Sequence, residues 1–220
     1  MSPADLFPPA PGHIGTDESG KGDYFGPLVV AGFYCPDDQA PVLRELGVRD
    51  SKALSDNRVR DIAASLQEGT IHSLVVVGPE KYNELYAKFR NLNKLLAWGH
   101  ARVIENILGR IDCAKAVTDQ FGDERFVLNA LMAKGRTIDL VQRPRGEEDT
   151  AVAAASILAR AEFVRRIEAL SGEWGVDLHK GAGPPVEAAA AVFLRRHGAA
   201  ALPKVAKMHF KITERVLRLL

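Results

Sequence analysis

Cysteine is scarce in this chain of 220 residues, which contains only Cys35 and Cys113. Two scattered cysteines are too few for a disulfide framework and do not have the spacing of a metal site. Long apolar runs are also missing, since none approaches the roughly 20 residues that a membrane helix needs. The first residues lack the basic start and the apolar stretch of a signal peptide. We therefore expect a soluble cytoplasmic protein that does not contact a membrane.

The chain also lacks a net excess of charge, because 29 basic and 28 acidic residues leave a formal charge of +1. A balance this close to zero argues against a protein that binds nucleic acid through bulk charge. The charges are unevenly distributed, however. Residues 1–159 contain 18 Lys/Arg and 22 Asp/Glu, whereas residues 160–220 contain 11 and 6. Exposed helices can produce such a split by chance, so charge alone does not decide the question.

Apolar residues make up 46% of the chain and charged residues 26%, a composition that excludes disorder and allows a buried core. The proline-rich residues 1–12 predict an irregular tail before a single domain at 13–220. Hydrophobic periodicity predicts strands at 13–16, 27–34, 70–77, 114–118 and 137–141. Helical periodicity and capping signals predict helices at 55–66, 80–89, 93–108, 124–132, 150–169, 186–197 and 209–219.

The order of these elements indicates the fold class. Three strands with short connections come first, and strands alternate with helices afterwards. This order predicts an α/β fold, in which an antiparallel meander continues into parallel strands of a mixed five-stranded sheet flanked by helices. The helices that follow residue 171 or so are expected to form a small C-terminal subdomain.

The first motif that bears on chemistry is Gly-Thr-Asp-Glu-Ser-Gly-Lys-Gly at residues 15–22, which nearly matches a phosphate-binding loop. Two departures argue against nucleotide binding. Gly22 stands where a hydroxyl would bind magnesium, and the loop leads into a strand, so no helix N-terminus meets the phosphates. What remains is the pair Asp17 and Glu18 at a strand end, followed by the turn Gly20–Gly22.

Successive strand residues point to opposite faces, so Asp17 and Glu18 cannot both face one metal ion from a regular strand. We expect the turn to bend Glu18 inward, or its carbonyl oxygen to contribute. Asp119 follows the strand at 114–118, where α/β folds place their sites. The acidic run Glu147, Glu148 and Asp149 precedes the long Ala-rich helix. Each of these has a purely structural alternative. The pair at 17–18 could simply be an acidic start of a tight hairpin, and Asp119 could be a helix cap or a solvated loop residue. The acids at 147–149 could stabilise the N-terminus of the helix that follows.

Together these acids indicate a metal site, because four converging carboxylates could not all stay ionised without a cation. Oxygen-only ligation suits Mg²⁺ or Mn²⁺. Two such ions about 3.5–4 Å apart would activate a water and stabilise a leaving oxygen in phosphodiester cleavage. Basic and amide groups near element boundaries could contact phosphates or ribose hydroxyls, namely those in residues 50–52, 91–93, 180–183 and 207–211.

Three other polar or aromatic residues have a structural interpretation. His100 falls on the apolar stripe of its predicted helix, so we expect a core histidine whose hydrogen bonds are satisfied. Trp98 and Trp174 are expected to be packing residues, with base stacking as the alternative.

At this point the sequence resembles the type 2 ribonuclease H family, and within it the ribonuclease HIII branch. The ribonuclease HII branch usually has Gly-Arg-Gly in the turn, where this chain has Gly20-Lys21-Gly22. The resemblance covers about residues 13–215. Its motifs recur in the family's order and are, in this chain, IGTDESGKGDYFGPLVVAG, DSKALS, KYNELY, NLNKLLAWGHA, VTDQFG, AVAAASILAR, KGAG and KMHFK.

The resemblance implies a ribonuclease H-like fold and a metal-dependent endoribonuclease that hydrolyses the RNA strand of RNA/DNA hybrids, leaving 5′-phosphate and 3′-hydroxyl ends. It implies two Mg²⁺ or Mn²⁺ ions during catalysis, and we expect the enzyme to act as a monomer. Asp17, Glu18 and Asp119 match the family's metal-binding acids. Glu147 is our choice for the fourth, with Glu148 or Asp149 as alternatives.

The resemblance also indicates how the substrate is bound. The turn Gly20, Lys21 and Gly22 matches the segment that contacts ribose 2′-hydroxyls, the groups that distinguish RNA from DNA. Lys52, Asn91 and Asn93 are candidates for contacts with the strands. The basic C-terminal stretch would be available to face phosphates.

One departure concerns substrate choice. Bacterial ribonuclease HIII typically has an additional N-terminal domain, similar to TATA-binding protein, that binds the hybrid. This chain has about a dozen residues before its first motif, which brings affinity and substrate preference into question. The alternatives are an HII-like incision at single ribonucleotides in duplex DNA, or a catalytically silent hybrid-binding module.

Overall fold

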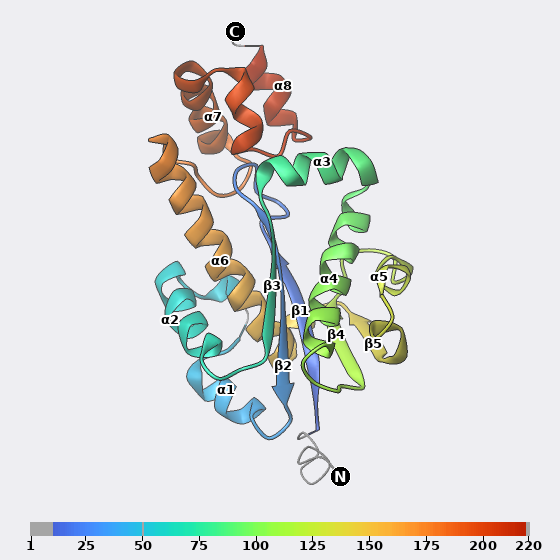
Figure 1. The fold of residues 1–220 in the computed structure, drawn as a ribbon. Helices are drawn as coiled ribbons and strands as arrows, with labels where there is room; N and C mark the ends of the chain where they lie inside the picture. Colours follow the sequence, from blue (N-terminus) through green and yellow to red (C-terminus); the bar gives the residue numbers. More distant parts are fainter. Residues whose placement is uncertain (1–10, 50, 219–220) are drawn as a thin grey trace.

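The structure is a computed structural model that describes residues 11–49 and 51–218. At its centre is a five-stranded sheet in the order β3-β2-β1-β4-β5 (Figure 1). The first three strands are antiparallel, and β4 and β5 continue the sheet parallel to β1. The strands are β1 (Gly12–Ser19), β2 (Leu28–Pro36), β3 (His72–Val77), β4 (Lys115–Asp119) and β5 (Asp139–Arg143). This confirms the predicted mixed sheet, although β1 is longer than predicted. Of the predicted tail, residues 1–10 lie outside the described residues.

Helices cover both faces of the sheet (Figure 1). One face is covered by α1 (Ala40–Leu46), α2 (Asp56–Gln67) and α6 (Thr150–Trp174). The other face is covered by α4 (Leu92–Leu108), beside which α3 (Pro79–Phe89) and α5 (Arg125–Ala130) pack. The C-terminal helices are α7 (Pro184–His197) and α8 (Lys211–Leu217). Short 3₁₀ helices are η2 (Ser51–Ala53), η3 (Gly135–Thr137), η4 (Gly146–Glu148) and η5 (Ala199–Lys204). No helix within the described ranges is long and apolar enough to span a membrane.

The N-terminal half of α6 lies directly against β1 because small residues line the contact. The run AVAAAS of α6 is buried throughout. Opposite it, Gly15 leaves no room for a side chain, since a Cβ there would lie 2.1 Å from the carbonyl carbon of Ala151. The helix continues to Trp174 and ends where Gly175 adopts a left-handed conformation with φ 59°. The predicted start of the C-terminal helices near residue 171 therefore falls inside α6.

Alternation along β1 decides which side chains reach which face. Thr16 and Glu18 contact α4, whereas Gly15 and Asp17 face α6. In the parallel pair of β1 and β4, Thr16 is the register partner of Thr118. Because β1 and β4 run in the same direction, Asp17 and Asp119 follow one residue later at equivalent positions of neighbouring strands.

The C-terminal segment holds the loop after the Gly20–Gly22 turn. Phe25 and Ala206 form an antiparallel bridge. The Lys207 side chain is fully buried, and its ammonium donates to the carbonyl oxygens of Asp23 and Gly26, both at 2.8 Å. Burial lowers the pKa of Lys207 to about 7. The expectation that Lys207 contacts phosphates is therefore wrong, because its ammonium is committed to the protein's own backbone.

Candidate active site

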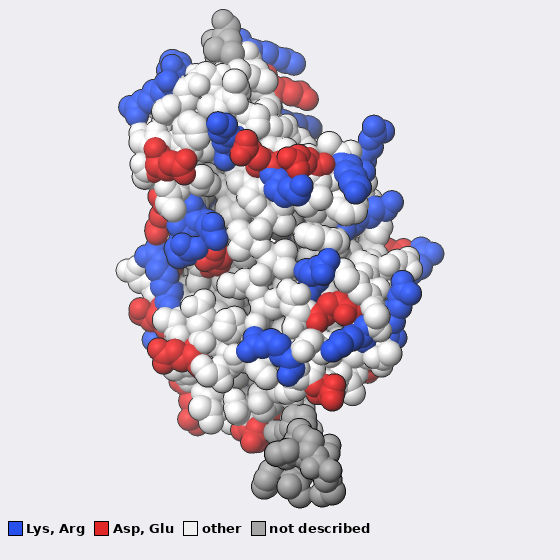
Figure 2. All heavy atoms as spheres, in the orientation of Figure 1, with Lys and Arg blue, Asp and Glu red and all other residues white. Residues whose placement is uncertain are grey.

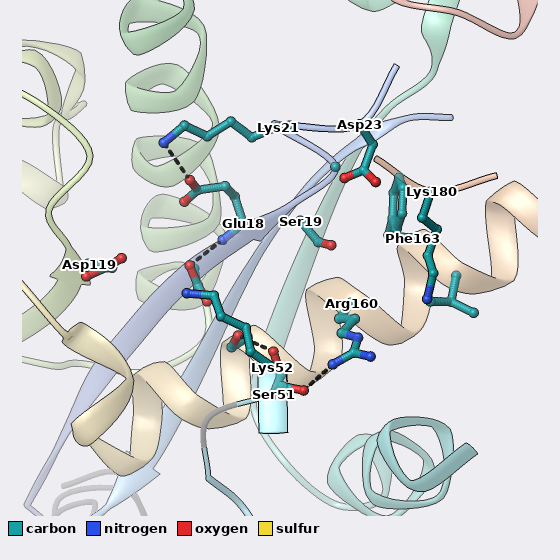
Figure 3. Close-up of a pocket in the computed structure, with 15 residues that line it drawn as sticks. Glu18, Ser19, Lys21, Asp23, Ser51, Lys52, Asp119, Arg160, Phe163 and Lys180 are labelled. Carbon is teal, nitrogen blue, oxygen red and sulfur yellow. Dashed lines mark hydrogen bonds and ion pairs between the residues drawn. The ribbon is translucent and has the colours of Figure 1, made fainter. Parts of the chain in front are cut away.

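A pocket of about 550 Å³ opens where β1 and β4 end (Figure 3). Its floor is acidic and its sides bear four basic side chains. Three of the four predicted metal ligands line it, and so do the predicted turn and Lys52. The lining residues are Asp17, Glu18, Ser19, Gly20, Lys21, Gly22, Asp23, Ser51, Lys52, Asp119, Ser156, Arg160, Phe163, Val164 and Lys180.

Asp17 is partly buried on the side of the sheet that faces α6. Its Oδ1 accepts a hydrogen bond from the backbone N–H of Glu18 at 2.8 Å, and Ser156 also hydrogen-bonds to it. Burial raises the pKa of Asp17 to about 7, and the nearby charges of Glu18 and Asp119 add to the rise. A carboxyl group in this environment is stabilised in its ionised form by a cation.

Glu18 lies on the opposite side of the same strand. The strand stays regular through Ser19, which pairs with Val29, so the backbone does not make the expected inward bend at Glu18, although Glu18 still lines the pocket. The other expectation, a contribution of its carbonyl oxygen, stays a prediction. Its Oε2 lies 3.1 Å from Nε2 of His100, and its Oε1 accepts from Lys21 at 3.3 Å (Figure 3). Burial acts to raise the pKa of Glu18, but the hydrogen bond and charge of His100, together with Lys21, outweigh it and lower the pKa.

Asp119 ends β4, as predicted, and is held by the segment before α6. Its Oδ1 accepts a hydrogen bond from the backbone N–H of Gly146 at 2.9 Å. The contact is close, since a Cβ on Gly146 would lie 2.8 Å from Cα of Asp119. The short helix η4 thus places its backbone against Asp119.

The acidic run in and after η4 is not brought into this pocket. Glu147 and Glu148 line a neighbouring hollow together with Arg44. Asp149 caps α6 by accepting from the N–H groups of Ala151 and Val152, and it also contacts His13 at 2.9 Å. Burial would raise the pKa of Asp149, but His13 and the helix N–H groups lower it. The role of Glu147 as the fourth ligand stays a prediction.

The donor set fits a hard divalent ion whose coordination is completed by other oxygens. Among the described residues, no three His, Cys, Asp or Glu side chains lie close enough to hold one metal ion as they stand. Mg²⁺ commonly keeps several waters and binds one or two carboxylates together with substrate phosphates. Burial is the main cause of the raised pKa of Asp17, and the charges of Glu18 and Asp119 add to it. A divalent ion beside these carboxyls would favour the ionised form.

Four basic side chains flank the acids, at Lys21, Lys52, Arg160 and Lys180 (Figure 3). Lys52 lies in η2 and is exposed. Arg160 and Lys180 both bind Asp56, at 2.7 and 2.5 Å, which fixes their position at the pocket. Sequence reasoning missed Arg160 and Ser156. Their spacing of four residues in the motif AVAAASILAR, which puts both on one face of α6, was the available signal.

The two predicted asparagines do not line the pocket. Asn91 caps α4, because its Oδ1 accepts from the backbone N–H groups of Asn93 and Lys94. Asn93 lies beside Gly122. Their contacts with substrate stay predictions, as do those of Lys52. Asp50, which belonged to another candidate segment, lies outside the described residues.

The structural interpretations of the remaining aromatic residues are confirmed. Trp98 packs against the core between α4 and the sheet, and Trp174 packs against Phe193 and His197. His100 is fully buried with both ring nitrogens hydrogen-bonded. Figure 2 shows basic and acidic side chains interspersed over one face of the molecule, with no continuous basic surface there. The basic side chains nearest the acids are those that line the pocket.

Asp17→Asn is expected to stabilise the metal-free protein at pH 8. A folded-state pKa near 7, above the usual 3.8, means that stability is lost as the pH rises between these values. The gain should be on the order of 2 kcal/mol, about half of what the full shift implies, because part of the carboxyl still faces water. Urea unfolding at pH 8 and pH 4 in a metal chelator measures it, and the gain should vanish at pH 4. Equal stability of both proteins at pH 8 would contradict the assigned environment.

The model of the ribonuclease HII family matches residues 14–213. Ribonuclease HIII of Protochlamydia amoebophila (strain UWE25) is 46% identical over 213 residues, which are 97% of this chain and 69% of that protein. Ribonuclease HIII of Chlamydia pneumoniae is 43% identical over 208 residues, covering 92% of this chain and 69% of that protein.

Solved structures give the same result. Bst-RNase HIII, crystallised in complex with Mn²⁺, has a TM-score of 0.88 at 33% identity, and the match covers 96% of this chain and 70% of that chain. RNase HII of Archaeoglobus fulgidus, solved in a complex with PCNA, has a TM-score of 0.77 at 28% identity. That match covers 93% of this chain and 96% of that chain. The similarity therefore extends over nearly the whole fold.

Proposed function

This chain belongs to the ribonuclease HII family and is an endoribonuclease of the ribonuclease H type, and we propose that the pocket at the ends of β1 and β4 is its active site. The substrate in this proposal is the RNA strand of an RNA/DNA hybrid. The observation that supports it most is the placement of Asp17 and Asp119 at equivalent positions of neighbouring parallel strands, inside a pocket with basic sides.

Asp17, Glu18 and Asp119 are the proposed ligands of two divalent ions, Mg²⁺ or Mn²⁺. When bound, such ions activate a water and stabilise the leaving oxygen of the cleaved phosphodiester. Asp17 and Asp119 present their carboxyls from the side that faces α6, and Glu18 does so from the side that faces α4. A phosphate of the substrate would supply further oxygen ligands.

Glu147 is proposed as the fourth acid on the resemblance alone. Its side chain lines the neighbouring hollow, while the backbone of its 3₁₀ helix lies against Asp119. A comparison of Glu147→Gln with Glu148→Gln tests the assignment, since only the first should lower cleavage. Equal activity of both variants and the parent would remove Glu147 from the site.

Substrate contacts are proposed for the turn Gly20–Gly22 and for the basic sides of the pocket. Gly20 has a φ of 87° and a Cβ there would meet the carbonyl oxygen of Pro27 at 2.2 Å, so this sharp turn requires glycine. Backbone groups of such a turn can approach a ribose closely and contact its 2′-hydroxyl. Lys52, Arg160 and Lys180 can contact phosphates, which position a nucleic acid without specifying its sequence.

Gly22→Ala is expected to weaken cleavage of a hybrid without destabilising the protein. A Cβ at Gly22 would meet no atom within 4 Å, so the folded protein has room for it. The added methyl group would keep the ribose of the substrate from approaching the turn. Losing one hydrogen bond to the 2′-hydroxyl, worth about 1.4 kcal/mol, should raise KM about tenfold. Steady-state kinetics and thermal unfolding measure the two effects. An unchanged KM would remove this turn from the substrate interface.

The test of the proposed function is a pair of cleavage assays with labelled RNA. One substrate is a multi-ribonucleotide hybrid, and the other is duplex DNA with a single ribonucleotide, each in Mg²⁺, in Mn²⁺ and in chelator. We expect cleavage of the hybrid with either ion, none in chelator, and products with 5′-phosphate and 3′-hydroxyl ends. Preferential incision of the second substrate would favour the HII-like alternative. Binding without cleavage in both metals would favour a silent hybrid-binding module.

The cytoplasmic location and the monomeric state remain proposals. Light scattering of the purified protein tests the second, and a mass twice the 23.9 kDa of the chain would contradict it.

A further inference from the structure

His100 is a buried polar residue whose partners all belong to the strands of the active site. It lies in α4 with no exposed surface. Its Nε2 is 3.1 Å from Oε2 of Glu18. Its Nδ1 is 2.8 Å from the hydroxyl of Thr16 and 3.3 Å from that of Thr118. Both ring nitrogens are thus satisfied by residues of β1 and β4, the two strands that carry the proposed ligands.

The chemistry of these partners fixes the direction of the bond to Glu18. An ionised carboxylate only accepts hydrogen bonds, so Nε2 of His100 carries a hydrogen and donates it. A hydroxyl can donate or accept, so Thr16 and Thr118 satisfy Nδ1 in either case. Turning the ring over would put the carbons Cδ2 and Cε1 where the two nitrogens lie and lose these contacts. The imidazole of His100 is therefore held in one orientation.

The hydroxyls that contact His100 come from two neighbouring strands, β1 and β4. Thr16 and Thr118 are register partners in the parallel pair of β1 and β4. Asp17 and Asp119 follow them by one residue. A ring that contacts both hydroxyls fixes the spacing of the strand ends from which these two carboxylates project.

Glu18 has two partners of unlike mobility. Lys21 binds Oε1 from a side chain that is 38% exposed, so it is free to move toward a phosphate of the substrate. His100 binds Oε2 from the interior, where the ring of Phe121 stacks on it with a centroid distance of 5.0 Å. When Lys21 leaves Glu18, the bond from His100 remains and keeps the carboxylate oriented.

We propose that His100 is a positioning residue of the active site, which holds Glu18 in the orientation that binds a divalent ion. This inference rests on the proposed function, because only that proposal makes Glu18 a ligand of a divalent ion. His100 touches neither the substrate nor the ion. It acts through one hydrogen bond to the ligand, and partners of this kind typically contribute 10- to 100-fold to metal affinity or activity.

Two conservative variants separate this role from packing. The amide nitrogen of Gln is as many bonds from Cβ as Nε2 of His, so His100→Gln can still donate to Glu18. The amide of Asn matches Nδ1 instead, so His100→Asn keeps the threonine contacts and loses the bond to Glu18. Ile104→Ala is the control, because Ile104 is fully buried in the same helix and lies in the hydrophobic cluster below the site.

Mn²⁺ binding is measured by titration calorimetry without substrate, and kcat and KM are measured on a hybrid. We expect His100→Asn to bind Mn²⁺ about 10- to 100-fold more weakly and to lose kcat by a similar factor, with KM for the hybrid unchanged. His100→Gln should stay within about threefold of the parent, since its donor is retained. Ile104→Ala should unfold more easily and bind Mn²⁺ normally.

Equal losses in the Gln and Asn variants would show that His100 only packs, and parental Mn²⁺ affinity in His100→Asn would also overturn the inference. If the parent itself neither binds Mn²⁺ nor cleaves the hybrid, the proposed function fails first. Cleavage by the parent together with normal Mn²⁺ binding in His100→Asn would leave the function standing and reject this role alone.

Discussion

Asp119→Asn is expected to lower kcat for hybrid cleavage about a thousand-fold while the protein stays folded. Asp119 is a proposed ligand at the end of β4, and losing one anionic ligand removes on the order of 4 kcal/mol of transition-state stabilisation. The fold should survive because the amide oxygen of Asn can still accept the hydrogen bond from Gly146. Initial rates in Mn²⁺ and a circular dichroism melt measure the two properties.

Asp123→Asn is the matched control for this prediction. It makes the same chemical change four residues further along the chain. Asp123 is paired with Arg125 at 2.6 Å and does not line the pocket. We expect the rate of this variant to equal that of the parent. Full activity of Asp119→Asn, or an equal loss in Asp123→Asn, would show that Asp119 is not a ligand.

Gly15→Ala should have the largest effect on stability. A Cβ at Gly15 would lie 2.1 Å from the carbonyl carbon of Ala151 and 2.2 Å from the backbone nitrogen of Val152. These are backbone atoms of α6 that cannot rotate away, so α6 would have to move off the sheet. The expected cost is about 3 kcal/mol or more, at or above the upper end of what overpacking usually costs because backbone must move, and a large part of the roughly 5–15 kcal/mol that stabilises a domain. Urea unfolding and the yield of folded protein measure it.

Gly172→Ala is the control for this substitution. Gly172 is exposed in the same helix, and a Cβ there meets nothing within 4 Å. Because alanine is the better helix former, this variant should be more stable by about 0.5–1 kcal/mol. A Gly15→Ala protein as stable as the parent would mean that α6 does not lie directly on β1.

Much of the fold could be predicted because it depends on local patterns. The apolar strand around Val30, the Ser55 cap of α2 and the helix at 93–108 were all predicted within a few residues. Asp119 was placed correctly because a carboxylate after a short apolar strand lies at the strand's end. Asp119 lies level with Asp17 only because of the register between β1 and β4. The pairing of strands far apart in the chain cannot be predicted from local periodicity.

The errors and omissions come from contacts over long sequence distances. Glu18 was expected to turn inward, but β1 stays regular because Ser19 still pairs with β2. The side chain instead finds His100, which is 82 positions away. His100 itself was predicted as a satisfied core residue, which is correct, but the sequence does not show that Glu18 is what satisfies it. Lys207 was misjudged because the carbonyl oxygens that bury it come from residues 23–26.

The central claim is that the acids at the ends of β1 and β4 bind divalent ions together with the substrate. It is tested most directly by Mn²⁺ titration of the parent protein with and without a hybrid whose RNA strand has a methylene group in place of the bridging 3′-oxygen at each scissile phosphate. Such a strand resists cleavage but keeps the 2′-hydroxyls and the non-bridging phosphate oxygens. We predict that the hybrid tightens Mn²⁺ binding at least about tenfold, and that Asp119→Asn abolishes this gain. Mn²⁺ binding that is equally tight with and without the hybrid, or unaffected by Asp119→Asn, would contradict the claim.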